Sequence, residues 1–187
     1  RGTYYFSNGD RYEGTFRDGK RNGLGTLYRA NGERYMGTYE NDRKAGRGTY
    51  YFLTGDTYEG TWISDQFNGQ GTYSFINGDS YVGQWKNGEH SGRGKFTWTN
   101  GNSYDGMFQS SLRAGMGTYE WANGNRYTGQ WRDGEQYGQG EKYWTNGDRY
   151  EGQWQNNKMN GQGKFFYANG NRFDGSFRDD EINGDGT

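Results

Sequence analysis

The chain has 187 residues, a formal net charge of −1, and neither cysteine nor proline. Hydrophobic residues make up only 28% of it and aromatic residues 19%, which excludes a rounded aliphatic core and, because disordered chains are poor in aromatics, also excludes disorder. The balanced charge excludes a strong bulk preference for nucleic acid. The missing cysteines exclude disulfides and thiol chemistry, and no apolar run is long enough for a signal peptide or a membrane span.

An aromatic residue recurs every 23 residues along the whole chain, at Tyr12, Tyr35, Tyr58, Tyr81, Tyr104, Tyr127, Tyr150 and Phe173. Nearly all of the glycines fall in four columns with the same period. Glycine therefore marks fixed positions and is not the filler of a flexible linker. An unbroken period of this length indicates a repeat architecture.

Each repeat is predicted to be a β-hairpin. Tyr81, Gly83 and Trp85 alternate with polar residues, and so do Tyr73 and Phe75, which is the periodicity of a β-strand. The polar stretches between successive hairpins are expected to be loops.

The turn inside each hairpin is predicted from its Asn-Gly pair. A two-residue turn is the usual conformation for Asn-Gly, but it would put Tyr73 and Tyr81 on opposite faces. A three-residue loop at 76–78, with its glycine left-handed and a bulge, places Gly71 opposite Gly83 and gathers the aromatics on one face. We prefer the three-residue loop.

Hairpins that stack edge to edge would continue one sheet and align equivalent residues, since a single hairpin is marginal in water. A second aromatic column, in which each ring is expected to pack on its copy in the next repeat, consists of Phe16, Tyr39, Trp62, Trp85, Phe108, Trp131, Trp154 and Phe177. The expected fold is all-β: an elongated, single-layer, twisted antiparallel sheet of eight stacked 23-residue hairpins with a groove.

The pattern Y-x-G-x-W, a nine-residue gap, then G-x-G-T-Y-x-F-x-N-G-D-x-Y resembles the MORN repeat (membrane occupation and recognition nexus), and the resemblance covers essentially the whole chain. It implies an elongated, twisted antiparallel sheet with a groove. It also implies a scaffold in cytoskeletal, ciliary or membrane-contact structures, radial spokes among them.

The first and last repeats do not differ from the others, although terminal repeats of such arrays normally carry a cap. We therefore expect residues 1–187 to form one continuous array of about eight repeats that is a window of a longer chain. The alternative is that a partner or a second copy covers the open sheet edges, since bare edges invite pairing.

Five basic residues are predicted to lie in successive inter-hairpin loops and to meet on one edge: Lys20, Arg21, Arg43, Lys44 and Arg47. Such a patch would attract anionic lipid or an acidic partner. The alternative is an ordinary solvated edge, and no continuous basic stripe extends beyond these repeats.

The middle repeats match the pattern best and carry the longest aromatic face. We predict a partner-binding groove lined by Tyr58, Trp62, Tyr81, Trp85, Trp98, Tyr104, Trp121, Tyr127 and Trp131, because exposed apolar surface of this kind usually marks binding. The alternative is that each ring is part of the core. Scattered apolar residues in the expected loops, such as Phe67, Met159 and Ile182, carry little weight here.

Two cations replace inward aromatics. Lys142 and Arg29 are each expected either to lie over a ring as a cation–π contact or to point into the groove toward an acidic partner.

The sequence offers no catalytic constellation. His90 is the only histidine, which argues against Ser-His or Cys-His catalysis and against a zinc site. The recurring acidic residues belong to the repeat and form no special pair of carboxylates. We therefore expect no enzyme activity, no metal and no cofactor.

The predicted function is a non-catalytic, cytoplasmic, cytoskeleton-associated scaffold that binds an extended or helical segment of a protein partner and self-associates through open sheet ends. A cilium or flagellum is the expected setting. The alternatives are a peripheral module for phosphoinositides or other anionic lipids, and a carbohydrate-binding hairpin array. Nucleic acid is not an expected partner.

Overall fold

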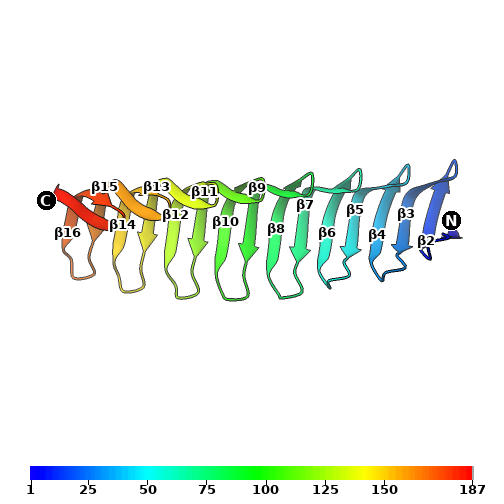
Figure 1. The fold of residues 1–187 in the computed structure, drawn as a ribbon, viewed down its shortest axis with the longest axis horizontal. Helices are drawn as coiled ribbons and strands as arrows, with labels where there is room; N and C mark the ends of the chain where they lie inside the picture. Colours follow the sequence, from blue (N-terminus) through cyan, green and yellow to red (C-terminus); the bar gives the residue numbers. More distant parts are fainter. Residues whose placement is uncertain (187) are drawn as a thin grey trace. The chain divides into compact units, whose positions relative to one another are not determined.

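The computed structural model describes residues 1–186 and contains 17 antiparallel β-strands in one open sheet, with no helix in that range (Figure 1). The chain divides into two compact units, Arg1–Ser91 and Gly92–Thr187, and within each unit the strands pair in sequence order. The strands are β1 Gly2–Tyr5, β2 Arg11–Arg17, β3 Lys20–Tyr28, β4 Arg34–Glu40, β5 Arg43–Tyr51, β6 Thr57–Ile63, β7 Gln66–Ser74, β8 Ser80–Lys86, β9 Glu89–Thr97, β10 Ser103–Gln109, β11 Leu112–Glu120, β12 Arg126–Arg132, β13 Glu135–Tyr143, β14 Arg149–Gln155, β15 Lys158–Phe166, β16 Arg172–Arg178 and β17 Glu181–Gly186.

The predicted hairpin register is confirmed. In the pair β7–β8, Gly71 lies opposite Gly83, and Tyr73 lies opposite Tyr81 on the same face. The Phe75 N–H donates to the Asp79 carbonyl at 3.0 Å, and the Gly78 N–H donates back to the Phe75 carbonyl at 2.9 Å. These bonds close a three-residue loop whose glycine has φ of 91°, as the bulge requires.

The stretches that we expected to be inter-hairpin loops are instead tight turns inside a continuous sheet. β6 ends at Ile63 and β7 begins at Gln66, and the two residues between them, Ser64 and Asp65, have φ of 47° and 70°. Positive φ at both positions defines a type I′ turn, which matches the twist of the flanking strands. The two-residue turn therefore exists in every repeat, but not at the Asn-Gly pair.

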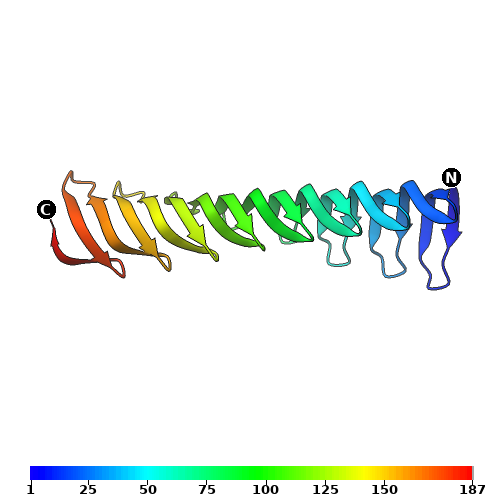
Figure 2. The ribbon, with the colours of Figure 1, turned by 90° about the horizontal axis from the view of Figure 1, so that it is seen from above.

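A bulge bends the longer strand of each repeat. The register between β6 and β7 shifts after Gly60, where Gly69 and Gln70 are inserted, and Gly69 has φ of 66°. Bulges of this kind bend the strand and raise its twist. Within each repeat the strands change direction at this bulge. The part of each strand next to the type I′ turn therefore crosses the remainder of the hairpin at an angle (Figures 1 and 2).

The first aromatic column lies flat on glycine inside this bend. Tyr58 is 0% exposed, and a Cβ added to Gly60 or to Gly71 would lie 2.5 Å from its hydroxyl oxygen. The hydroxyl donates to the Thr61 carbonyl at 3.0 Å. Glycine is therefore required under these rings, which explains two of the four glycine columns in the sequence.

The second aromatic column does not pack on its own copies, so that expectation was wrong. Trp62 instead contacts Tyr35 of the preceding repeat and Tyr58 of its own repeat edge-to-face, with ring centroids 5.1 and 5.3 Å apart. Its indole N–H donates to the Gly48 carbonyl at 3.0 Å. The same arrangement recurs for the other tryptophans of this column, Trp85, Trp131 and Trp154, and we call these four the core tryptophans.

Candidate functional site

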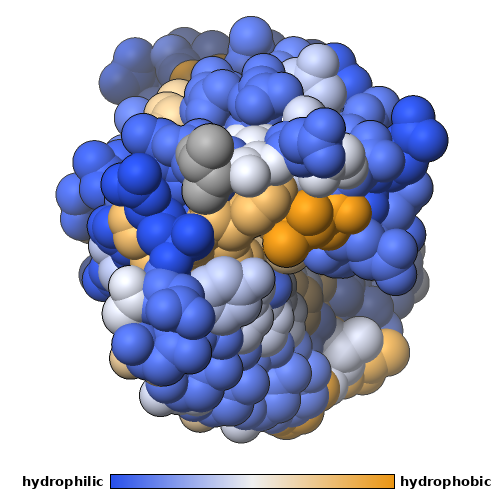
Figure 3. Space-filling model, turned by 90° about the vertical axis from the view of Figure 1, so that its left-hand side faces the viewer, coloured by the Kyte–Doolittle hydropathy of each residue, from blue (hydrophilic) through white to orange (hydrophobic). Residues whose placement is uncertain are grey.

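A stripe made mostly of half-buried aromatic side chains runs beside this core, and it also includes the buried residues Leu27 and Tyr50 and two cations. Its inner column occupies the end of each longer strand, and its outer column is the first residue after that strand. In unit 1 the stripe consists of Leu27, Arg29, Tyr50, Phe52, Tyr73 and Phe75, and in unit 2 of Phe96, Trp98, Tyr119, Trp121, Lys142, Trp144, Phe165 and Tyr167. We call this surface the aromatic stripe. The end that carries the C-terminus shows apolar side chains gathered inside a polar rim (Figure 3).

In unit 1 the stripe is continuous from one repeat to the next. The centroids of Tyr50 and Phe52 are 4.6 Å apart, those of Phe52 and Tyr73 are 5.6 Å apart, and those of Tyr73 and Phe75 are 4.6 Å apart. The Tyr73 hydroxyl donates to Asp56 Oδ2 at 2.9 Å. The turn of the preceding repeat thus fixes the inner ring.

In unit 2 the stripe carries a tryptophan in three successive outer positions. The ring centroids of Trp98 and Tyr119 are 5.5 Å apart, and those of Tyr119 and Trp121 are 4.7 Å apart. Trp98, Trp121 and Trp144 are half-buried, so each rests on the protein and keeps part of its surface in solvent. Such surfaces are typical of binding sites.

One cation lies in the stripe and another lies beside it. Lys142 Nζ lies 4.9 Å from the ring of Trp121 and 5.0 Å from that of Trp144, which confirms the cation–π alternative, and burial lowers the pKa of Lys142. Arg113 lies over Trp131 at 4.4 Å, and burial lowers its pKa as well. Both line a cavity of about 310 Å³ together with Tyr119 and Trp121.

The cation that replaces an inward aromatic in unit 1 behaves differently. Arg29 forms an ion pair with Asp10, with 3.1 Å between Nη1 and Oδ2. The same carboxylate accepts a hydrogen bond from the Ala30 N–H at 2.9 Å. Arg29 therefore stabilises a turn and does not lie over a ring as Lys142 does.

Most of the predicted groove residues belong to the core instead. Four are 0% exposed, namely Tyr58, Tyr81, Tyr104 and Tyr127, and three are 2–6% exposed, namely Trp62, Trp85 and Trp131. Their rings are covered by the bend of the sheet, so the expectation that they line a groove was wrong. Only Trp98 and Trp121 of the predicted set lie in the aromatic stripe.

The predicted basic patch is dispersed because its residues lie on strands and not in loops. Arg21 lies over Tyr39 at 4.9 Å, and Lys44 lies over Tyr50 at 4.4 Å, where burial lowers its pKa. Lys20 and Arg43 are exposed beside the tight turns.

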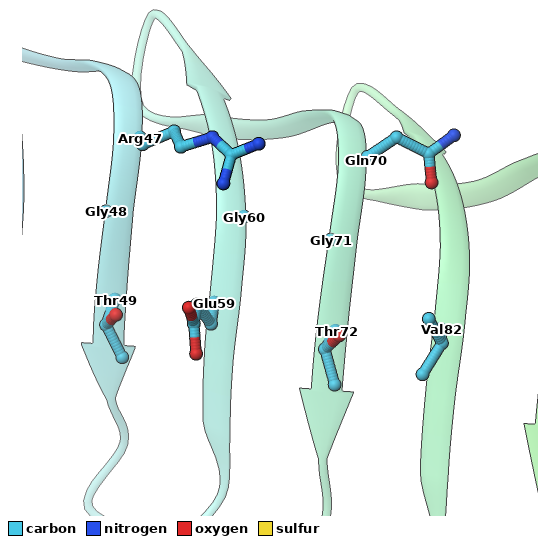
Figure 4. Close-up of a pocket in the computed structure, with 9 residues that line it drawn as sticks. All are labelled: Arg47, Gly48, Thr49, Glu59, Gly60, Gln70, Gly71, Thr72 and Val82. Atoms are coloured by element: carbon cyan, nitrogen blue, oxygen red, sulfur yellow. The ribbon is translucent and has the colours of Figure 1, made fainter.

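Arg47 points away from the aromatic side. It lines a shallow cavity of about 440 Å³ on the opposite face of the sheet, with Thr49, Glu59 and Val82 (Figure 4). The five predicted basic residues therefore form no single surface.

Sequence reasoning also missed a covering column. The residue that faces each core tyrosine is chemically variable: Phe67 stacks on Tyr58 and His90 stacks on Tyr81, both at 3.7 Å between centroids. Met159 occupies the equivalent place and is 7% exposed. Its position, four 23-residue periods after Phe67 and three after His90, was the signal that could have revealed this role.

Within residues 1–186 no group of three or more histidine, cysteine, aspartate or glutamate side chains is arranged to hold a metal ion. The same range contains no helix that is long and apolar enough to cross a membrane.

Comparison with known structures finds a similar fold in a solved domain. The SAS-4 (dCPAP) TCP domain of Drosophila melanogaster, solved in complex with a proline-rich motif of Ana2 (dSTIL), is 13% identical, with a TM-score of 0.50 over 80% of this chain and 82% of that chain. The TCP10c domain of Drosophila melanogaster Sas-4 is 12% identical, with a TM-score of 0.46 over 80% and 90%. No curated protein matches the chain.

The comparison with protein-family models matches almost the whole chain. The MORN repeat model matches eight consecutive segments, at residues 1–11, 12–34, 35–57, 58–80, 81–103, 104–126, 127–149 and 150–172. These segments follow the 23-residue period of the hairpins. The chain therefore belongs to the MORN repeat family.

Proposed function

We propose that this chain is a non-catalytic scaffold module that binds a segment of a protein partner along the aromatic stripe. The observation that carries the proposal is the division of the aromatics into two sets. The buried set completes the core, whereas the half-buried set, Trp98 and Trp121 among it, recurs in successive repeats and keeps part of its surface in solvent. Partly exposed aromatics beside cations are typical of binding hot spots.

Two comparisons support this proposal. The SAS-4 TCP domain, which shares the fold, was solved with a proline-rich motif of another protein bound to it. We propose a cytoskeletal or ciliary assembly in the cytoplasm as the location, because scaffolds of the MORN family are the nearest guide to it. Self-association through open sheet ends belongs to the same proposal.

Binding to anionic lipid has less support. Arg21 and Lys44 contact rings, and Arg47 lies on the other face. Of the five predicted residues, only Lys20 and Arg43 remain exposed near the turns. Two exposed cations contribute only about 2 kcal/mol at an anionic surface.

The test is selection of peptides from a random displayed library on the full chain, followed by affinity measurements on variants. Phe52→Ala and Trp121→Ala remove rings of the aromatic stripe in the two units. We expect each to weaken some selected peptides by about tenfold or more, as for a hot spot. Met116→Ala is the matched control, because Met116 is 57% exposed on the other face.

Circular dichroism and gel filtration establish that each variant is folded and monodisperse. Peptides that bind both stripe variants as tightly as the unchanged chain, or that depend on Met116 instead, would show that the stripe is not the docking surface.

A further inference from the structure

The three outer tryptophans of unit 2 differ from the core tryptophans in their indole N–H groups. Each core tryptophan donates to a glycine carbonyl at 3.0–3.2 Å. Trp98, Trp121 and Trp144 are half-buried, and their N–H groups have no acceptor among residues 1–186. An indole is only a donor, so these three are available to a carbonyl of a bound chain.

The spacing of these donors selects the conformation of that chain. Successive outer tryptophans are separated by two strands, or about 9.6 Å. Three residues of a polyproline II helix advance about 9.3 Å and return the same side to the surface. An α-helix covers the same distance in about 6.4 residues, which is not a whole number of turns. A β-strand needs three residues too, but its side chains then alternate faces.

The polyproline II conformation also has the complementary chemistry. Its backbone makes no internal hydrogen bonds, so its carbonyls are free to accept from indole N–H groups. Proline rings pack against aromatic surfaces, and the preformed helix loses little conformational entropy on binding.

A charge in the same place adds a second requirement. Lys142 lies between Trp121 and Trp144 and forms no ion pair with the residues that the structure describes. The adjoining cavity also contains Arg113. A bound segment therefore gains from an acidic side chain at this point.

Building on the function proposed above, we propose that unit 2 binds a proline-rich segment in the polyproline II conformation. Every third residue of the segment is a proline that packs over Trp98, Trp121 and Trp144, and an acidic side chain of the segment pairs with Lys142.

The direct test uses a fluorescent synthetic peptide of repeated Pro-Ala-Glu triplets and the full chain. A peptide of the same composition with unevenly spaced prolines is the control. We expect the periodic peptide to bind about tenfold more tightly. In ¹H–¹⁵N spectra of the chain, which has seven tryptophans, the indole signals of the three outer tryptophans should shift and those of the four core tryptophans should not.

Variants divide the site into its parts. Trp121→Phe keeps a ring that the same column tolerates at Phe52 and Phe75 but loses the donor, and we expect affinity to fall about 2- to 12-fold, as for one hydrogen bond. Lys142→Gln should weaken the glutamate peptide and leave its glutamine analogue unchanged. Lys95→Gln, an exposed lysine on the other face, should change neither.

The outcomes separate this inference from the proposed function. Equal affinity for the two peptides, or shifts confined to the core indoles, would overturn the polyproline II assignment. Library peptides that still require Trp121 would then leave the proposed function standing with an occupant of another shape. If neither type of peptide binds at the stripe, both proposals fall.

Discussion

At the scale of single residues, the column that covers the core tyrosines accepts side chains of different chemistry. Phe67, His90 and Met159 occupy equivalent places and cover the same kind of ring. Histidine at this position has a cost that phenylalanine lacks, because burial lowers the pKa of His90 to about 4. Charging it in the folded chain would require water to reach a site against Tyr81 and Trp85.

Replacing His90 by phenylalanine should therefore remove a pH dependence. The pKa of His90 lies below that of an unfolded histidine, so its share of the stability is complete above about pH 6.5 and is lost as pH falls toward about 4. The loss is at most about 3 kcal/mol. Urea unfolding across this range should show a decline in the unchanged chain and a much flatter profile for His90→Phe.

A carboxylate whose pKa is lowered on folding loses its contribution to stability at lower pH than a buried histidine does. The N–H of Ile76 holds the pKa of Asp56 below its usual range, so its contribution is lost only below about pH 4. If His90→Phe declines as steeply as the unchanged chain between pH 6.5 and 4, the charge of His90 is not the cause.

At the scale of elements, the tight turns bind each repeat to the one before it. The Asp65 N–H donates to the Lys44 carbonyl at 3.1 Å, and Asp65 Oδ1 accepts the Lys44 N–H at 2.8 Å. Gly88 holds the equivalent place and keeps only the backbone bond, to Phe67. An aspartate here therefore adds a bond to the preceding repeat but must adopt a left-handed backbone.

Alanine and glycine at position 65 separate these two effects. Asp65→Ala loses the side-chain bond and keeps the unfavourable φ of 70°, so we expect a loss of about 2 kcal/mol. Asp65→Gly loses the same bond but relieves the backbone, and it should cost about 1 kcal/mol less than alanine. Chemical denaturation measures both, and equal losses would mean that the left-handed conformation carries no penalty here.

At the scale of the whole molecule, the repeats follow one another in sequence order, and each hairpin depends on its neighbours. Strands pair in sequence order within each unit, so most interactions are local. For such arrays, stability is approximately a sum over repeats and their interfaces. The 23-residue period also keeps each side chain on its own face from one repeat to the next.

Deleting one complete repeat tests this organisation. Removal of residues 58–80, one family-matched segment, should join equivalent points and leave a folded sheet of lower stability. A deletion one residue shorter, 58–79, would displace the next tyrosine by one position and turn its strand inside out. Circular dichroism and thermal unfolding should show cooperative unfolding for the first deletion and loss of structure for the second. Equal behaviour of the two would contradict a fixed register.

The hairpins, their period and the pairing of Gly71 with Gly83 could be read from local patterns, because side-chain alternation and turn chemistry act within a few residues. The burial of individual rings could not be read in this way. Trp85 and Trp98 both follow strand periodicity, yet one is core and the other is in the aromatic stripe. The difference arises at the glycine bulge, which bends the sheet over the core tyrosines and covers the first ring while it leaves the second in solvent. That bend depends on contacts between strands. The sequence pattern therefore did not indicate which rings the bent sheet covers and which it leaves in solvent.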